Sequence, residues 1–170
     1  LTFRQSDLVV ATQGRGFYVM DDIAIFGQIA NEQAEKSLHV ITPSPTQMIT
    51  GRRGPGKNEG ANPPNGVIIS YHIAEENDGS LSIEILDSMG NLIRNYSSEE
   101  SDYDRCVIGN MSPRQKRKLK YPSKKKGMNL WNWDMRRNGI MCIDDVFLFS
   151  GWNGAKVMPG DYQARISIGD

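Results

Sequence analysis

The amino-acid sequence predicts an all-β protein built from two antiparallel sheets packed face to face. The first observation is that apolar and polar residues alternate in several segments, so that each segment has one apolar face. The second is that glycines and turn-forming dipeptides separate these segments. Short strands with a single apolar face bury it when two sheets cover each other. The alternating segments are residues 67–73, 81–87, 131–135 and 162–168.

The middle of the chain predicts a series of short strands joined by tight turns. The strand at 67–73 has its apolar residues at odd positions. It is followed by Asn77-Asp78-Gly79-Ser80, a hairpin-type turn signal, and then by the strand at 81–87. A second turn, Ser88-Met89-Gly90-Asn91, leads into a further strand at 92–97.

The last third of the chain continues this pattern. Trp131 and Trp133 lie on the same predicted face as Met135, which is typical of a strand that contributes to a core. The segment at 162–168 has its apolar residues at even positions. These strands together favour an immunoglobulin-like antiparallel β-sandwich over residues 66–170.

The segment DLVVATQGRGFYVMDD, residues 7–22, predicts a β-hairpin. Its strands are Leu8–Thr12 and Phe17–Met20. The turn is Gly14-Arg15-Gly16, in which the glycines supply the positive φ angles that a tight turn requires. An isolated two-stranded hairpin is only marginally stable in water, so this one must join a larger assembly.

A short helix is predicted after the hairpin, because Ile23, Phe26 and Ile29 follow helical spacing. A further strand is expected at 38–41, before a stretch dense in proline and glycine that lacks periodicity. We therefore divide the chain into a terminal hairpin with a short helix at 1–45, a Pro/Gly-rich linker at 46–65, and the β-sandwich at 66–170.

Composition limits the function classes. The 20 basic and 20 acidic residues give no net charge, so no overall field favours nucleic acid or a membrane surface. No apolar run approaches the roughly 20 residues that span a bilayer. The sequence has neither a signal peptide nor an initiator Met. We therefore expect this chain to be a processed or excised part of a longer protein. Cys106 and Cys142 define no disulfide framework, and we expect two free, partly buried thiols.

Two charged motifs have features of binding sites. Gly51–Lys57 has the spacing of a phosphate-binding loop, but Asn58 stands where Ser or Thr is required, and no nucleotide cofactor is expected. Residues 113–127 are strongly basic and suit a phosphate backbone, an acidic glycan, or a solvated loop balanced by the acidic residues 99–104. Lys124, Lys125 and Lys126 are the candidate ligand-binding residues of this run.

Trp152, in the loop SGWNGAK, is the tryptophan best placed for exposure. It is a candidate for stacking on a sugar ring, and the alternative is that it caps the end of the sandwich core. No metal site is expected, because neither His39 nor His72 has a further ligand at suitable spacing. No catalytic residue is expected either. The doublets Asp21-Asp22 and Asp144-Asp145 are more typical of turns and caps than of a glycosidase carboxylate pair.

Several motifs, in order along the chain, resemble one family. DLVVATQGRGFYVMDDI is similar to the closing strands of bacterial sortilin-like, BNR-repeat β-propeller proteins of the glycosyl hydrolase or sialidase-like kind. GKNEGANPPNGVIISYHI resembles the segment that follows them, with Glu59-Gly60-Ala61 interrupting its G-K-N-P-P pattern. SLSIEILDSMGNLIRNYSS, MNLWNWDMRR and AKVMPGDYQARISIGD are similar to later strands of the same family.

The resemblance implies a C-terminal immunoglobulin-like domain, similar to that of flagellar hook-capping proteins, preceded by a propeller-like hairpin. It implies a non-catalytic module of a secreted, periplasmic or cell-surface bacterial protein, which packs on or presents its parent propeller and contacts other proteins. The alternatives are a fragment of an exo-acting, sialidase-like glycosidase whose catalytic blades are absent, and a glycan-binding module. We expect the hairpin at 7–22 to dock on the sandwich, and pairing with a second copy in a symmetric dimer is the second expectation.

Overall fold

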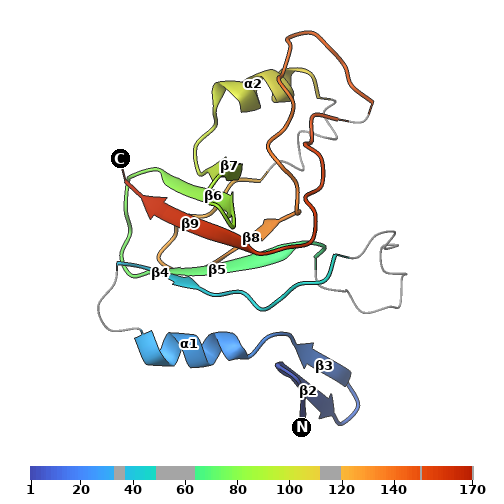
Figure 1. Ribbon diagram of the computed structural model, residues 1–170. Coiled ribbons are helices and arrows are strands. Elements are labelled where there is room, and N and C mark those ends of the chain that lie inside the picture. The colour runs from blue at the N-terminus through green and yellow to red at the C-terminus, as the bar shows by residue number, and fades with distance from the viewer. Residues whose placement is uncertain (33–36, 49–63, 112–119, 150, 170) are drawn as a thin grey trace.

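The computed structural model describes residues 1–32, 37–48, 64–111, 120–149 and 151–169. It is mainly β, with 39% strand and 10% helix, which confirms the predicted all-β sandwich preceded by a hairpin and a short helix. The described strands form three antiparallel sheets (Figure 1). In chain order the elements are β1 (Thr2–Arg4), β2 (Asp7–Thr12), β3 (Gly16–Met20), α1 (Ala24–Glu32), β4 (Leu38–Ile41), β5 (Val67–Ile73), β6 (Leu81–Asp87), β7 (Leu92–Ser97), α2 (Asp102–Gly109), β8 (Gly127–Trp133) and β9 (Tyr162–Ile168).

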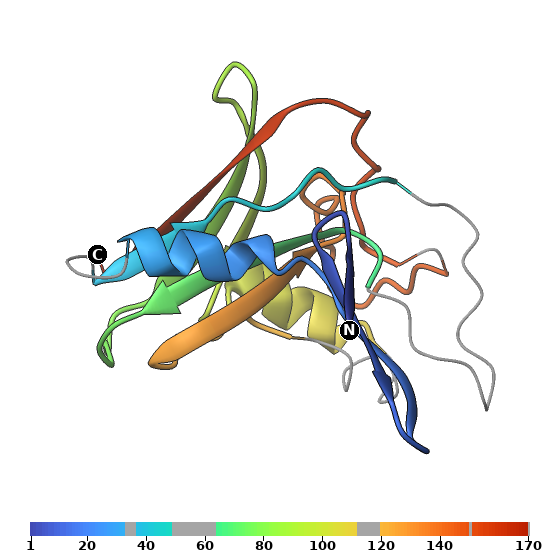
Figure 2. The same ribbon diagram turned by 90° about the horizontal axis from the view of Figure 1, so that it is seen from below.

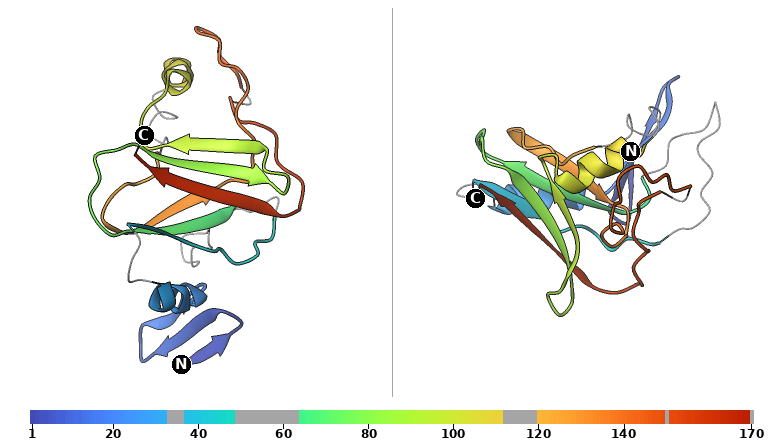
Figure 3. Two further views of the ribbon diagram at one scale, coloured as in Figure 1. Left: turned by 60° about the vertical axis from the view of Figure 1, so that its left-hand side comes forward. Right: turned by 90° about the horizontal axis from the view of Figure 1, so that it is seen from above.

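The N-terminal sheet has the order β1-β2-β3 and stands apart from the sandwich (Figures 1 and 3). The expected docking of the hairpin on the sandwich is therefore wrong, and all of β3 is exposed. The predicted hairpin is confirmed, since β2 pairs with β3 and the register runs from Leu8 opposite Met20 to Thr12 opposite Gly16. Gly14 and Gly16 adopt φ angles of 83° and 85°, which favour glycine. Strand β1 is an addition to the prediction and pairs with the start of β2.

The sandwich consists of one sheet with the order β4-β5-β8 and a second with the order β7-β6-β9, which face each other (Figure 3). The predicted alternation sets which side chains lie between them. The central strands β5 and β6 supply most of the fully buried residues. The core cluster consists of Ile69, Tyr71, Ile73, Leu81, Ile83, Ile85, Ile93, Trp133, Met135 and Val157.

Strand β4 joins the sandwich from the other side of the Pro/Gly-rich stretch. It pairs with β5 from Leu38 opposite Ile73 to Ile41 opposite Ser70. The sandwich therefore takes in residues that precede the predicted linker as well as those that follow it. Residues 49–63, which form most of that linker, lie outside the described residues.

Helix α1 makes a third layer on the outer face of β4 and β5. Cross-strand neighbours share a face, so Ile41 and Ser70 point away from the core, yet both are buried. Helix α1 lies against this face (Figures 1 and 2). The side chain of Gln28 fixes its position, because its amide accepts from Thr42 N–H at 2.9 Å and donates to Thr42 O at 3.0 Å.

One of the two predicted turns has a different role from the expected one. The sequence predicts a hairpin around Asn77–Ser80, but β5 and β6 belong to different sheets, so this connection crosses the sandwich. Its tight geometry remains, since Asn77 Oδ1 accepts from Gly79 N–H at 2.7 Å. The turn at 88–91 does join a hairpin, β6 to β7, and its Gly90 has a φ of 85°.

The expectation of free thiols is wrong. Cys106 in α2 and Cys142 form a disulfide, with their Cα atoms 6.1 Å apart. Helix α2 was itself not predicted. It begins after Ser101, whose hydroxyl accepts from Asp104 N–H while the Asp104 carboxylate accepts from Ser101 N–H, which is a capping box. The helix brings Cys106 to the loop that contains Cys142. The two cysteines are 36 residues apart in the sequence, so local patterns could not predict that they lie close together.

Candidate docking surface

The N-terminal sheet carries apolar side chains on both of its faces. Cross-strand pairs place Leu8 with Met20 and Val10 with Tyr18 on one face, and Val9 with Val19 on the other. All of β3 is exposed, including Phe17 at 79%. A sheet that is solvated on one side normally shows one polar face. This sheet therefore has the composition of one that is covered on both sides.

The N-terminal sheet also has a free edge. Strand β3 is hydrogen-bonded to β2 on one side, and no described strand pairs with its other side. It contains neither a proline nor a charged residue, the features that commonly protect an edge strand from pairing. The edge can therefore accept a further strand.

A second apolar area lies on the outer face of β5 and β8, on the side of the sandwich that α1 covers. The register places Ser70 opposite Leu130 and His72 opposite Met128. Leu130 is 64% exposed, and Met128 and Ile68 are also partly exposed. The sequence holds a signal for this face that the prediction did not use, because MNLWNW in β8 has apolar residues at both odd and even positions. We name Ile68, Met128, Leu130 and the N-terminal sheet together the docking surface.

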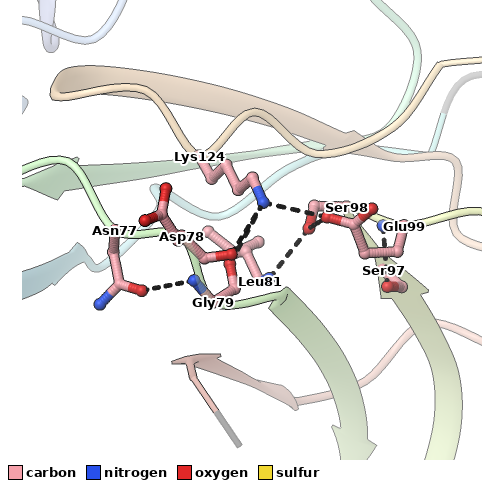
Figure 4. A network of polar contacts seen from close by, with 8 residues as sticks. All are labelled: Asn77, Asp78, Gly79, Leu81, Ser97, Ser98, Glu99 and Lys124. Atoms are coloured by element: carbon pink, nitrogen blue, oxygen red, sulfur yellow. Dashed lines mark hydrogen bonds and ion pairs between the residues drawn. The ribbon is translucent and has the colours of Figure 1, made fainter.

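The candidate ligand residue Lys124 makes its polar contacts to other residues of this chain (Figure 4). Its ammonium group donates to Glu99 Oε1 at 3.0 Å and to the carbonyl oxygens of Asp78 and Gly79 at 3.3 and 3.4 Å. The hydrogen bond from Lys124, followed by its charge and by the Ser98 hydroxyl, lowers the pKa of the Glu99 carboxyl. Lys124 therefore ties the β5–β6 connection to the chain after β7.

Lys125 and Lys126 are exposed, so two of the three candidate lysines face solvent. Residues 113–119 of the basic run lie outside the described residues, as does the Gly51–Lys57 motif. The structure thus separates the candidate lysines by role, because Lys124 has three partners while its two neighbours are at the surface.

Of the two interpretations of Trp152, exposure for sugar stacking is wrong. Its side chain is buried, with 6% of the residue accessible, so neither face of the ring is open for stacking on a sugar. The Tyr103 hydroxyl of α2 donates to Trp152 O at 3.2 Å. The disulfide and this hydrogen bond hold the loop against α2, which explains why a tryptophan in a Gly- and Asn-rich segment is covered.

A groove of about 1020 Å³ opens between the two sheets beside β9. Its lining is mainly apolar, and Asp161 is the charged residue among the described ones. General acid–base hydrolysis of a glycoside needs two carboxyl groups, and this lining offers one.

In the described part of the chain, no three His, Cys, Asp or Glu side chains gather as metal ligands. In the same residues, neither helix is long and apolar enough to cross a bilayer.

Comparisons with known proteins identify no relative: no family model, curated protein or solved structure matches this chain. The clearest features of the chain are the two exposed apolar areas of the docking surface and the groove beside β9.

Proposed function

We propose that this chain is a non-catalytic β-sandwich module that packs on a β-rich neighbouring domain through its N-terminal sheet. The main support for this proposal is that the sheet has apolar residues on both faces while β3 is exposed throughout. Exposed apolar surface of this extent marks an interaction site in a soluble protein. The neighbour that fits the sequence resemblance is a β-propeller, of which this sheet would complete a blade.

The geometry of the sheet supports that neighbour. Propeller blades are four-stranded sheets packed radially, so each blade is covered on both faces by other blades. The N-terminal sheet has three strands, both faces are apolar, and the edge of β3 is free for a fourth strand. Helix α1 and the Gln28–Thr42 hydrogen bonds connect this sheet to the sandwich, which would hold the sandwich beside the propeller.

The disulfide supports placing the module outside the cytoplasm. Disulfides such as Cys106–Cys142 persist in oxidising compartments, including the periplasm and the extracellular space. We therefore propose a secreted, periplasmic or cell-surface location. The parent protein could be a glycosidase, because the catalytic residues of such an enzyme would lie on propeller blades outside these 170 residues. Direct glycan binding has less support, because Trp152 is buried and Lys124 is engaged.

The test is complementation between two polypeptides. The propeller region that the proposal places in the same gene is produced separately and mixed with this chain. We expect a stable complex by light scattering and slower hydrogen exchange at the β3 amides. The double variant Phe17→Ser/Val19→Ser should lose the complex, whereas Met89→Ser, at an exposed methionine in the β6–β7 turn, should retain it.

Two results would contradict the proposal. One is that the two polypeptides do not associate and that residues 8–20 exchange at the rate of an unfolded chain. The other is hydrolysis of a glycoside by this chain alone that is lost in Asp144→Asn or Asp145→Asn, since the module would then be catalytic.

A further inference from the structure

The disulfide between Cys106 and Cys142 lies at the surface of the molecule. Both cysteines are partly exposed, and neither belongs to the buried cluster between the two sheets. They line a surface hollow of about 510 Å³, whose other described lining residues are Asp102, Tyr103, Arg105, Met141 and Asp144. Exchange with a thiol requires access to a sulfur atom, so this disulfide meets the first condition for exchange.

A side-chain amide lies beside both sulfur atoms. Asn110 donates through Nδ2 to Ile143 O at 2.7 Å. The same nitrogen lies 3.6 Å from Cys142 Sγ and 3.9 Å from Cys106 Sγ. A hydrogen-bond donor stabilises a thiolate, and the better stabilised thiolate leaves faster in exchange. Cys106 lies in the last turn of α2, where the negative end of the helix dipole disfavours a thiolate, so Cys142 is the favoured leaving sulfur.

Little apolar burial holds α2 to the loop after β8, which comprises residues 139–149 and 151–153. In α2 only Val107 is buried. The exposed apolar side chains of the loop are Ile140, Met141, Ile143, Phe147 and Phe149. Hydrogen bonds from Asn110 and Tyr103 add to the disulfide. The core cluster contains no residue of α2 or of this loop, so opening the disulfide should separate the two segments while the sandwich stays folded.

We propose that Cys106–Cys142 is a thiol–disulfide exchange site that reacts with a dithiol, and that its opening releases the loop from α2 and uncovers Trp152. In the oxidised chain Trp152 is buried, and its main-chain oxygen accepts from the Tyr103 hydroxyl of α2. The site lies at the opposite end of the molecule from the N-terminal sheet (Figures 1 and 3). The inference is therefore independent of the neighbour proposed for that sheet.

The reaction has two steps. One thiolate of the dithiol attacks Cys106 Sγ, the S–S bond breaks, and Cys142 leaves as a thiolate that takes up a proton. The second thiolate of the dithiol then attacks the reagent sulfur of the mixed disulfide, and Cys106 leaves and is protonated in turn. The dithiol loses two electrons and two protons and becomes a disulfide, and the chain gains them as two thiols.

The charges around the hollow favour a cationic reagent over an anionic one. Asp102 is paired with Arg105, whereas none of the described residues forms an ion pair with Asp144. An unpaired carboxylate at the hollow attracts a cationic thiol and repels an anionic one. Small dithiols and the dithiol of an oxidoreductase protein share the required chemistry, and positive charge beside the reacting sulfur favours either.

The first experiment compares reduction of the folded and the unfolded chain. The full oxidised chain is treated with dithiothreitol in buffer and in denaturing urea. If only global unfolding exposed the disulfide, the rate in buffer would be the unfolded rate multiplied by the unfolded fraction, which urea unfolding measures independently. We expect a rate at least about tenfold above that product. Reduced thioredoxin is tested in buffer as the protein dithiol, and the faster of the two reagents identifies the preferred source.

The second experiment follows what the opening releases. In the reduced and alkylated chain, amide exchange at Val107 should rise by about tenfold or more, while exchange at Ile83 in the core should stay unchanged. Tryptophan fluorescence should shift to longer wavelength as Trp152 meets water. Trp152→Phe should lack this shift, whereas the matched control Trp131→Phe should keep it.

The third experiment tests the charge and the leaving sulfur. Cysteamine, which is cationic, should react about threefold or more faster than 2-mercaptoethanesulfonate, which is anionic, at equal thiolate concentration. Asp144→Asn should reduce this ratio, whereas Asp161→Asn, at an exposed carboxylate outside the described lining of the hollow, should preserve it. Alkylation and mass spectrometry of the first product should find the reagent on Cys106 and a free thiol on Cys142.

Three results would overturn the proposal. The first is a reduction rate in buffer less than about tenfold above the product expected for global unfolding, because the disulfide would then be purely structural. The second is faster exchange at Ile83 together with Val107 after reduction, because the sandwich would then unfold with the loop. The third is the reagent mainly on Cys142, because the Asn110 amide would then not select the leaving sulfur.

Discussion

Cys106 in helix α2 is bonded to Cys142 in the loop that follows β8, which joins two segments 36 residues apart in the sequence. Asn110, at the end of α2, reinforces this connection, because its side-chain amide donates to Ile143 O at 2.7 Å. Both contacts lie outside the two sheets of the sandwich. The helix and the loop are thus held to each other by a covalent bond and a hydrogen bond rather than by a large apolar core.

Removing this disulfide should lower the stability of the chain substantially. We expect Cys106→Ser/Cys142→Ser to reduce the free energy of unfolding by about 3–4 kcal/mol, because the bond closes a loop of this length in the unfolded state. Urea unfolding of the oxidised chain and the double variant measures the difference. Thiol titration of the denatured, unreduced chain should find no free sulfhydryl, and two free sulfhydryls would contradict the disulfide.

A glycine at the base of the same loop should resist substitution. A Cβ atom at Gly154 would overlap the carbonyl oxygens of Asn138 and Arg137, which are backbone atoms that a rotamer change cannot move. Gly154→Ala should therefore destabilise the chain by about 2 kcal/mol. Gly27→Ala in α1 is the matched control. It meets no atom within 4 Å and should be neutral or stabilise the helix by about 0.5–1 kcal/mol. Equal midpoints for both variants in thermal unfolding would contradict this close approach.

The strands were predictable from the sequence because a strand with one buried face shows alternating apolar and polar residues along its own length. Strands β5, β6 and β9 show this pattern, and each lies where the sequence predicts it. Pairing is not local, so the sequence did not show that β5 and β6 lie in different sheets. Helix α2 had a local signal that was overlooked, since Ser101 and Asp104 have the spacing of a capping box.

The candidate site was predictable only in part, for the same reason. The apolar hairpin at 7–22 pointed to a docking role, and the run LVVA in β2 already carries apolar residues for both faces of a sheet. The burial of Trp152 depends on a loop that folds back onto α2, and that contact involves residues about 50 positions apart. The role of Lys124 likewise depends on Glu99 and on the turn at Asp78, which the fold brings together.

Two tyrosines should make stability sensitive to alkaline pH. Burial raises the pKa of both Tyr71 and Tyr96 to about 12, and the Tyr71 hydroxyl donates a hydrogen bond to Ser123 O at 2.5 Å. A pKa raised in the folded state means that folding favours the protonated form. The stabilisation is therefore complete below pH 10, the ordinary value, and is lost as the pH rises to about 12.

Absorbance at 295 nm measures this titration, and unfolding midpoints between pH 8 and 12 measure its consequence. Tyr71→Phe/Tyr96→Phe should flatten the loss of stability in this range. It should also cost about 1–2 kcal/mol at neutral pH, since the Ser123 carbonyl loses its donor. A single titration of all six tyrosines near pH 10 would contradict the effect of burial.

Lys124 should act as a structural residue and not as a glycan ligand. Its hydrogen bond holds the pKa of the Glu99 carboxyl below the ordinary value, so the pair stabilises the fold above that value and the effect disappears as the pH falls. Lys124→Met should raise the Glu99 pKa toward its ordinary range, which a carbon-detected NMR titration measures directly. Lys126→Met, at an exposed neighbour, should leave the Glu99 pKa unchanged.

The same two variants can be applied to a glycan array. Binding of an acidic glycan that is lost in Lys124→Met but retained in Lys126→Met, with the Glu99 pKa unmoved, would show that Lys124 serves a ligand rather than the connection between β5 and β6.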